Sequence, residues 1–274
     1  MICEWTKLVA VLPRWLAAEV DKYGKKDLQE IHLRLGQVPE LKMGQRSLWL
    51  DPLVSMDDLN FVINAASGYS PWAASTMADG YLTAAGGHRI GICGEAVIKD
   101  GRVETFRRIH SLCIRVAKDI PGISGDCSCL DGSILILGPP GSGKTTLLRD
   151  LLRRIAQNET VGVVDQRCEI FPEGITRGKR MDVITGCSKQ DGIEILLRTM
   201  GPDCIGVDEI TSELDARALL QGGWCGVRMI ATAHASSLED LHRRQVYRPL
   251  VELKLFDHIL VLNREKRWKE VSGL

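Results

Sequence analysis

The sequence has no excess of charge of either sign, few aromatic residues and no long apolar run. Its 35 basic and 35 acidic side chains cancel over 274 residues, and aromatic residues make up only 5%. Binding to single-stranded nucleic acid usually requires a basic surface interleaved with aromatic side chains, so composition disfavours that class. No apolar run reaches about 18 residues, the length of a membrane-spanning helix. We therefore predict that the chain does not cross a membrane by itself.

The cysteines also lack the spacing of a common metal-binding motif. None of the nine forms a Cys-x-x-Cys pair, and Cys127 and Cys129 are the only two that lie close together. Ordinary reduced thiols are therefore favoured, with a metal or redox site as the alternative for this pair. Reduced thiols are typical of a cytoplasmic protein.

The residue pattern changes near position 118. Residues 1–117 combine helical patterns at about 4–20 and after Ser55 with short β-like runs, which predicts a smaller α+β domain. Residues 118–130 contain a cluster of turn formers and are predicted to be a linker. In residues 131–274 short apolar runs alternate with helical patterns. This alternation favours an α/β fold with a mainly parallel sheet.

The expected strands and helices have the following bounds. In the first domain, β-like runs cover residues 31–35, 47–50, 81–84, 89–93, 95–98 and 112–116. In the second domain, strand-like runs cover residues 133–137, 161–165, 204–208, 229–233 and 258–262, and helical patterns cover 145–156, 189–200 and 214–221.

A phosphate-binding loop follows the first strand of the second domain. Residues 138–145 read GPPGSGKT and match G-x-x-x-x-G-K-[ST] between an apolar strand and an amphipathic helix. Backbone N–H groups of the loop and the helix N-terminus bind phosphate, while Lys144 reaches the β- and γ-phosphates and Thr145 coordinates Mg²⁺. ATP and Mg²⁺ are therefore the predicted ligands. The predicted nucleotide-binding residues are Gly138, Pro139, Pro140, Gly141, Ser142, Gly143, Lys144, Thr145 and Thr146.

Adjacent acidic residues end a later strand. Asp208 and Glu209 follow the apolar run that begins at Cys204. At this place Asp208 would join Thr145 at the metal ion, and Glu209 would polarise the water that attacks the γ-phosphate. The alternative is a helix N-cap, because Ser212 and a glutamate follow.

Two further segments place polar side chains at strand ends. Asp165 and Glu169 follow the strand at 161–165, and His234 ends the strand at 229–233. Because the carboxyl ends of parallel strands meet at one edge of the sheet, these residues are expected near the nucleotide. Asp165 and Glu169 would adjust the binding of the metal ion, the position of the water or the coupling of hydrolysis to other steps. His234 would donate a hydrogen bond to the γ-phosphate. Solvated loop charges and a structural histidine are the alternatives.

Four segments together resemble the boxes of secretion-type ATPases. They read GPPGSGKTT, VVDQRCEI, LLRTMGPDCIGVDEI and ATAHASS, and they are similar to the Walker A, acidic, Walker B and histidine boxes of that superfamily. The resemblance implies a RecA-like P-loop core that hydrolyses ATP to ADP and phosphate. It also implies a homo-oligomer in the form of a hexameric ring.

The first domain narrows the resemblance. GYLT at 80–83, GGHRIG at 86–91 and SLCIRVA at 111–117 are similar to the N-terminal domain of the stage III sporulation protein AA family. The resemblance implies a mother-cell ATPase that acts with integral membrane components of the channel between mother cell and forespore. It implies membrane association only through these partners, and no nucleic acid.

The sequence departs from these families at several positions. Thr211 and Ser212 stand where pilus motors carry an arginine and an aspartate, and Gln166 stands where the sporulation family is expected to have glutamate. The acidic box therefore has one charge fewer than expected. An arginine that acts across a subunit boundary is not expected directly after Glu209.

Arginines of the first domain are the candidates for that role. The superfamily uses arginines of its N-terminal domain against the nucleotide, and the matching region here contains Arg89, Arg108 and Arg115. Arg115 is the first choice for a catalytic role, because it lies on a predicted strand just before the linker. An exposed salt bridge is the alternative for each.

Other functions of a P-loop protein stay open at this point. A nucleic-acid-associated RecA-like ATPase is the main alternative, with Arg243, Arg244 and Arg248 as its basic cluster. A small-molecule kinase is another, with residues 177–180 as a short arginine-containing lid. A nucleotide-binding module without turnover is a third.

Overall fold

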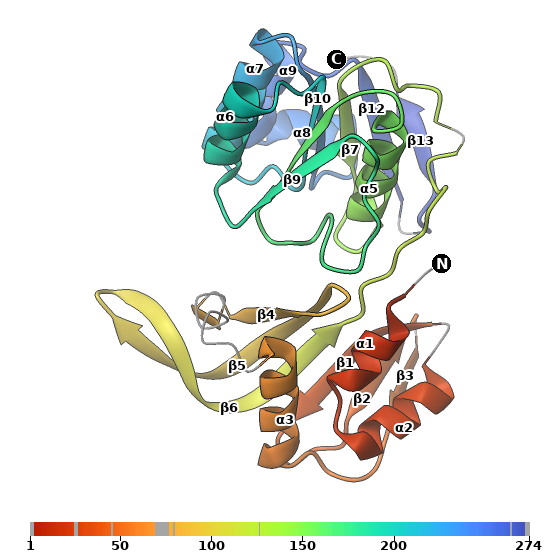
Figure 1. Cartoon of the computed structure of the whole chain (residues 1–274), viewed down its shortest axis with the longest axis vertical. Helices are drawn as coiled ribbons and strands as arrows, with labels where there is room; N and C mark the ends of the chain where they lie inside the picture. Colours follow the sequence, from red (N-terminus) through yellow and green to blue (C-terminus); the bar gives the residue numbers. More distant parts are fainter. Residues whose placement is uncertain are drawn as a thin grey trace. The chain divides into compact units, whose positions relative to one another are not determined.

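The computed structural model describes residues 3–24, 27–44, 46–68, 77–78, 80–125, 127–263 and 265–271. The chain forms two compact units, which are described separately below (Figure 1). The first comprises the chain up to Asp119 together with Pro172–Ile175. The second comprises Ile120–Phe171 and the chain from Thr176 onward.

The first unit is an antiparallel sheet with helices on one face. Its strands lie in the order β3-β2-β1-β6-β5-β4. The long β5–β6 hairpin turns at Asp100 and Gly101, both at positive φ, as the Asp-Gly pair predicts. The elements of this unit are α1 (Trp5–Ala10), α2 (Arg14–Tyr23), β1 (Leu28–Arg34), β2 (Glu40–Met43), β3 (Arg46–Trp49), α3 (Met56–Ser67), β4 (Tyr81–Ala84), β5 (His88–Lys99) and β6 (Arg102–Arg115).

Three helices bury the core of the first unit. The helix expected at 4–20 is in fact two helices, because Pro13 has no N–H group to continue α1 and instead precedes α2. Leu8 and Leu16 on these helices are fully buried. The helix α3 begins at the expected cap, where Ser55 and Asp58 form a capping box.

The second unit is built on a mainly parallel sheet. Its strands lie in the order β13-β12-β7-β11-β10-β8-β9, with β13 antiparallel to β12 and the other neighbours parallel. The elements of this unit are β7 (Ile134–Leu137), α5 (Lys144–Ile155), β8 (Val161–Asp165), β9 (Met181–Thr185), α6 (Lys189–Thr199), β10 (Cys204–Val207), α7 (Glu213–Trp224), β11 (Arg228–Ala233), α8 (Leu238–Arg243), η2 (Gln245–Tyr247), α9 (Arg248–Glu252), β12 (His258–Leu262) and β13 (Trp268–Val271).

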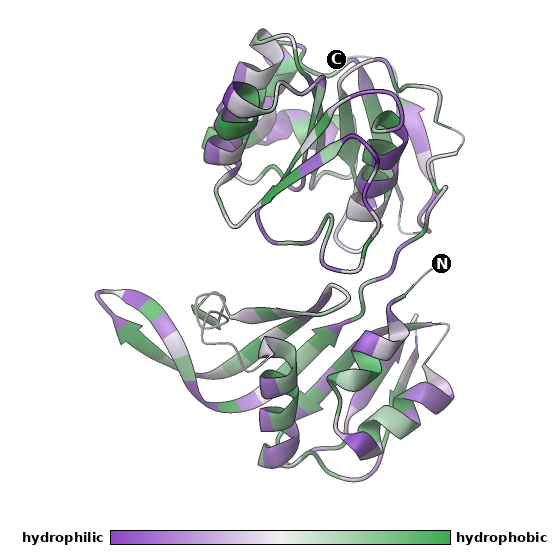
Figure 2. Ribbon diagram, viewed as in Figure 1, coloured by the Kyte–Doolittle hydropathy of each residue, from purple (hydrophilic) through white to green (hydrophobic). Residues whose placement is uncertain are grey.

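Glycines allow helices to pack closely on both faces of this sheet. A Cβ atom at Gly206 in β10 would lie 2.4 Å from Leu152 of α5. On the other face, a Cβ atom at Gly162 in β8 would lie 2.9 Å from Leu196 of α6. Figure 2 shows that the inner strands are mostly hydrophobic, as expected for strands covered on both sides. The carboxyl ends of the strands are left to hold polar side chains.

Part of the predicted linker packs against α5. The carboxylate of Asp150 accepts hydrogen bonds from the backbone N–H groups of Gly122 and Ser124, at 2.8 and 2.9 Å. Cys127 and Cys129 are buried in the same segment. Residues 120–125 and 127–130 are therefore part of the second unit.

Candidate functional site

The phosphate-binding loop joins a buried strand to a buried helix. All four residues of β7 are buried, and α5 begins directly after Gly143, which has a φ of 99°. Gly138 has no space for a side chain, because a Cβ atom would lie 2.5 Å from Oγ of Ser142. Among the described residues, this buried Oγ has no hydrogen-bond partner. An oxygen-rich ligand in the loop would supply one, so the loop fits a phosphate group.

Lys144 is folded back onto its own loop. Its Nζ donates to the carbonyl oxygens of Gly138 and Pro139, at 2.9 and 3.1 Å, and lies 3.1 Å from Nδ1 of His234. Burial lowers the pKa of Lys144, while the carboxylates of Asp208 and Glu209 oppose this shift. The ammonium group is therefore held beside the phosphate-binding loop with partners that a phosphate oxygen can replace.

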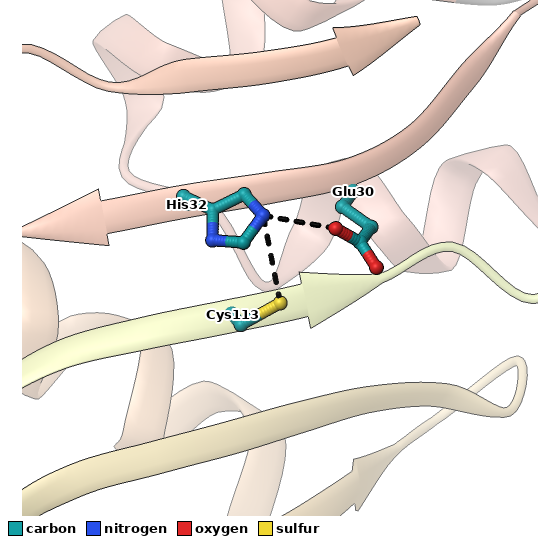
Figure 3. A group of neighbouring side chains, drawn as sticks. All are labelled: Glu30, His32 and Cys113. Carbon is teal, nitrogen blue, oxygen red and sulfur yellow. Dashed lines mark hydrogen bonds and ion pairs between the residues drawn. The ribbon is translucent and has the colours of Figure 1, made fainter. Parts of the chain in front are cut away.

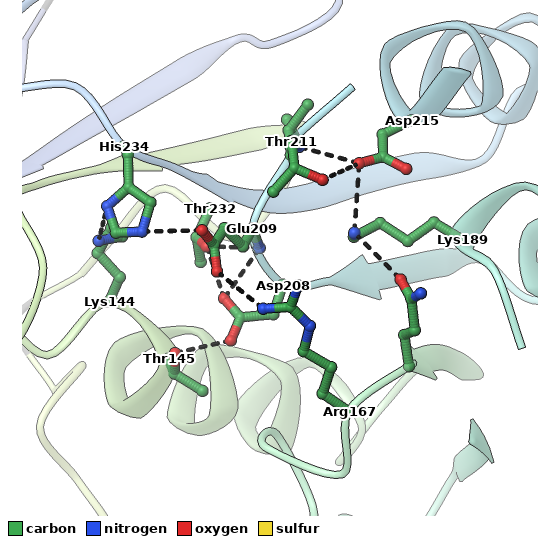
Figure 4. A network of polar contacts seen from close by, with 12 residues as sticks. Lys144, Thr145, Arg167, Lys189, Asp208, Glu209, Thr211, Asp215, Thr232 and His234 are labelled. Atoms are coloured by element: carbon green, nitrogen blue, oxygen red, sulfur yellow. Dashed lines mark hydrogen bonds and ion pairs between the residues drawn. The ribbon is translucent and has the colours of Figure 1, made fainter. Parts of the chain in front are cut away.

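His234 connects Lys144 to Glu209 (Figure 4). Its Nε2 lies 3.0 Å from Oε1 of Glu209, while Nδ1 faces the ammonium group of Lys144. An ammonium group has no lone pair, so Nδ1 must accept and Nε2 must carry the proton if the ring is neutral. The predicted lysine, histidine and glutamate therefore form one continuous chain of polar contacts.

Asp208 lies at the centre of a second set of contacts. Its Oδ2 accepts a hydrogen bond of 2.7 Å from the hydroxyl of Thr145, and its Oδ1 accepts one of 2.6 Å from Thr232. Mg²⁺ prefers oxygen ligands and is usually held by one or two protein groups plus phosphate. The adjacent hydroxyl of Thr145 and carboxylate of Asp208 fit this requirement.

Glu209 has a strained backbone. Its φ is 43°, which is uncommon for a residue other than glycine, and its N–H group donates to Oγ1 of Thr232 at 2.8 Å. Thr232 is fully buried and thus supports both acidic residues. No role was predicted for Thr232 from the sequence, although it precedes His234 by only two residues.

Arg167 also lies near Glu209. Its Nη1 is 3.8 Å from Oε2 of Glu209, and its side chain is half exposed. Only the acidic residues of its segment were predicted to lie near the nucleotide, and no role was predicted for Arg167. The signal that could have found it is an arginine two residues beyond the end of β8.

Asp165 organises the loop that follows β8. Its carboxylate accepts hydrogen bonds from the backbone N–H groups of Glu169, Ile170 and Phe171. Burial raises the pKa of Asp165, and the backbone donors act against this increase. Asp165 and Glu169 line a small cavity together with Asp208 and others. Their place near the Walker B acids agrees with the strand-end argument, but their catalytic role stays a prediction.

A buried ion pair lies on the other side of the cavity. Nζ of Lys189 is 3.2 Å from Oδ2 of Asp215 and 3.4 Å from Oε1 of Gln166. Asp215 also accepts from the backbone N–H groups of Thr211 and Ser212, the turn that follows Glu209 (Figure 4). This ion pair was not predicted from the sequence. Only the capping-box spacing of Ser212 and Asp215 signalled it.

Arg115 belongs to the first unit. It is the last residue of β6, its side chain is 66% exposed, and its Nε lies 3.6 Å from Oε1 of Glu30. Arg108 is also exposed and pairs with Glu95 at 3.1 Å. These contacts are the exposed salt bridges that were the alternative for both arginines. A role of Arg115 at the nucleotide therefore stays a prediction.

Comparison with known proteins identifies the family. The family described as "Sporulation stage III, protein AA" matches residues 5–274. The chain belongs to this family. It is 33% identical over 290 aligned positions to "Stage III sporulation protein AA" of Bacillus subtilis (strain 168), an alignment that covers 98% of this chain and 94% of the relative. The recognition made from the sequence is thus confirmed.

Two solved structures have the same fold as this member of the sporulation family. The ATPase DotB of Legionella pneumophila matches with a TM-score of 0.62 at 18% identity, over 94% of this chain and 79% of DotB. The pilus retraction motor PilT, solved with bound ADP, matches with a TM-score of 0.63 at 18% identity, over 90% of this chain and 76% of PilT. The predicted fold class, a RecA-like P-loop core preceded by a smaller α+β domain, is therefore confirmed.

The helices of the described residues do not reach membrane-spanning dimensions. None of them combines the length and the hydrophobicity that are needed to cross a bilayer.

Proposed function

We propose that this protein is an ATP-hydrolysing motor of a secretion-like channel complex, acting between mother cell and forespore during endospore formation. The observation that carries the proposal is the continuous set of contacts from Lys144 through His234 to Glu209, with Asp208 and Thr145 beside it. Membership in the sporulation family and the fold of DotB and PilT support it.

Nucleotide binding would begin with an exchange of partners at Lys144. Its ammonium group leaves the carbonyl oxygens of Gly138 and Pro139 and donates to β- and γ-phosphate oxygens. The backbone N–H groups of residues 141–146, in the loop and the first turn of α5, donate to the same phosphates. Thr145 and Asp208 would hold Mg²⁺, which supplies positive charge that offsets the charge developing on the phosphate oxygens.

Hydrolysis would use Glu209 as the group that accepts a proton from the attacking water. Its side chain is one-third exposed and is positioned by His234 at 3.0 Å and by Arg167 at 3.8 Å. The hydrogen bond from Thr232 to Asp208 helps to fix the orientation of the Asp208 carboxylate, so the two acidic residues face different partners. Asp208 faces Thr145, whereas Glu209 faces His234. The carboxylate of Glu209 can take up the proton that the attacking water releases.

The wider assembly is part of the same proposal. We infer a hexameric ring in which Arg115 of the first unit completes a nucleotide site, and recruitment from the cytoplasm to integral membrane components on the mother-cell side. Support comes from the family, which is named for sporulation, and from the exposed position of Arg115. An arginine supplied in this way raises phosphoryl-transfer rates by about 10³-fold or more in other P-loop enzymes.

Replacement of Glu209 by glutamine tests the hydrolytic role. Glu209→Gln is expected to bind Mg-ATP with unchanged affinity and to lose at least about 100-fold in the rate of phosphate release. The matched control is Glu213→Gln, which removes an exposed acid from the first turn of α7 and should keep the wild-type rate. A Glu209→Gln protein that hydrolyses ATP at the wild-type rate would show that this assignment is wrong.

Sedimentation of the Glu209→Gln variant with ATP tests assembly separately. Because this variant is expected to retain nucleotide, ATP should convert it to a hexamer, and Arg115→Ala should reduce turnover without preventing assembly. A protein that stays monomeric with ATP bound, or that phosphorylates a metabolite instead of releasing phosphate, would contradict the motor.

A further inference from the structure

Two buried thiols meet at the start of the second unit. Sγ of Cys127 lies 2.9 Å from Sγ of Cys129, and both side chains are buried. The segment is held against α5, where Arg154 donates to the carbonyl oxygen of Cys127 at 3.1 Å. The nucleotide site described above uses neither thiol. The pair was also the one cysteine feature that the sequence left open.

A histidine and two carboxylates lie next to this pair. Nδ1 of His258, at the start of β12, is 2.7 Å from Oε1 of Glu270 in β13, and its Nε2 is 3.6 Å from Oδ1 of Asp131. The ligand atoms of Cys129, His258 and Glu270 all lie within 4.8 Å of one another. Three parts of the chain that are distant in sequence therefore bring sulfur, nitrogen and oxygen donors together.

We propose that Cys129, His258 and Glu270, with Cys127 as the fourth ligand, bind a divalent cation of the zinc type. Thiolate sulfur, imidazole nitrogen and carboxylate oxygen are all ligands that tetrahedral Zn²⁺ accepts, whereas Mg²⁺ and Ca²⁺ prefer oxygen ligands. Neighbouring donors around tetrahedral zinc lie about 3.3–3.8 Å apart, given metal–ligand bonds of about 2.0–2.3 Å. The ligand atoms of Cys129, His258 and Glu270 already lie near this spacing, whereas the side chain of Cys127, whose Sγ is 2.9 Å from that of Cys129, must move to join them.

A metal explains the pair better than thiol–disulfide chemistry does. Both thiols are buried, so the thiol partner that disulfide exchange requires has little access to them. Nitrogen and oxygen ligand atoms, in contrast, already lie beside Cys129. A bound metal ion removes the thiol proton outright and also offsets the negative charge of Glu270 and Asp131.

The first unit contains another group of a glutamate, a histidine and a cysteine, namely Glu30, His32 and Cys113 (Figure 3). This group differs from the proposed metal site in its ion pairs. Nε2 of His32 lies 2.9 Å from Oε2 of Glu30 and 3.9 Å from Sγ of Cys113. Glu30, however, is already paired with Lys42 at 3.4 Å and Arg115 at 3.6 Å. The positive charges of Lys42 and Arg115 would repel a metal ion at Glu30. Among the described residues, Glu270 instead forms its ion pair with His258, which is itself a proposed ligand.

The metal would fasten one edge of the sheet in the second unit. Cys127 and Cys129 lie just before β7, whereas His258 and Glu270 lie on β12 and β13. β13 is an edge strand of only four residues, paired with β12 through backbone hydrogen bonds. Coordination adds a cross-link at this edge, so metal binding is expected to raise the melting temperature.

Cobalt titration of the full-length chain tests the site. The protein is stripped of metal, kept reduced with a phosphine and titrated with Co²⁺, which reports thiolate ligands through a near-ultraviolet charge-transfer band. The wild type should show this band with the visible spectrum of tetrahedral Co²⁺, and Zn²⁺ should displace it. Cys127→Ser should reduce the band to roughly half, and Cys129→Ser should weaken Co²⁺ binding by at least about tenfold.

Two partly exposed ligands keep the test valid if a buried variant does not fold. His258→Asn and Glu270→Gln should each weaken Co²⁺ binding by about 10- to 100-fold and abolish the rise in melting temperature. Cys93→Ser, at an exposed cysteine, and Cys113→Ser, in the second group, should leave the band unchanged. The proposal is overturned if the wild type gives no band, or if the band persists in the Cys127→Ser/Cys129→Ser double variant or is lost in Cys113→Ser.

Discussion

The two sheets of this protein use their charged side chains in different ways. In the antiparallel sheet of the first unit, acids are matched by cations on neighbouring strands, as Glu30 is by Lys42 and Arg115. In the parallel sheet of the second unit, Asp208 and Glu209 instead lie together at the end of one strand. Their contacts are hydroxyl groups, one histidine and the distant guanidinium group of Arg167.

This difference follows from sheet geometry. An antiparallel register places opposite charges face to face along the strands, so each charge is neutralised locally and remains partly in water. In a parallel sheet the carboxyl ends of the strands lie at one edge, so the polar side chains that follow them meet there. The carboxylate of Asp208, whose contacts are hydroxyl groups, keeps its capacity to bind a metal ion.

The largest expected effect comes from removing Lys144, the lysine of the phosphate-binding loop. Lys144→Ala should lower ATP turnover by about 10³-fold and also weaken ATP binding, because no other side chain replaces its charge at the phosphates. Radioactive phosphate release and fluorescent-nucleotide binding measure the two effects. The control, Lys42→Ala, removes a half-exposed lysine from the antiparallel sheet and should change neither. Equal losses in the two variants would remove the functional distinction between the sheets.

An intermediate effect is expected at the buried pair beside the cavity. Asp215→Asn should lower the free energy of unfolding by about 2 kcal/mol at neutral pH, because Lys189 loses its charged partner and the Thr211 turn loses a strong acceptor. Urea denaturation followed by circular dichroism measures the loss. Glu239→Gln, at an acid in the first turn of α8, should cost less than about 0.5 kcal/mol.

The pH dependence of this effect has a definite sign. Burial raises the pKa of Asp215, but the N–H group of Thr211 and the charge of Lys189 outweigh it, so the net pKa lies below the ordinary value of 3.8. A carboxyl with a lowered pKa stabilises the fold above its ordinary pKa and loses this contribution as the pH falls through its folded value. The difference between wild type and Asp215→Asn should therefore be full at neutral pH and shrink below about pH 4. A difference that grows on acidification would contradict the charged pair.

In the parallel sheet of the second unit, sequence periodicity located the inner strands well and the edge strands poorly. β8 and β12 begin and end at the predicted residues, because an apolar run bounded by turn formers or charges defines each of them. β9 and β13 were not predicted. Both lie at an edge of the parallel sheet and are only partly buried, so pairing with a neighbour defines them more than an apolar pattern does.

The site was predicted where it depends on strand ends and missed where it depends on tertiary contacts. Lys144, Asp208, Glu209 and His234 were found because each belongs to a local motif next to a strand. Thr232 was missed because its hydroxyl acts on acidic residues 23 and 24 positions away. Only the fold shows that such residues meet.

The smallest expected effect concerns the antiparallel sheet. Glu30→Gln removes the acid shared by His32, Lys42 and Arg115, yet we expect the opening free energy of β1 and β6 to fall by less than about 1 kcal/mol. The side chains of Lys42 and Arg115 are 47% and 66% exposed, so water can solvate both once the carboxylate is gone. Hydrogen exchange of the β1 and β6 amides, followed by mass spectrometry, measures this locally. A loss above about 2 kcal/mol would mean that matched charges on the antiparallel sheet carry as much stability as the buried pair of Lys189 and Asp215.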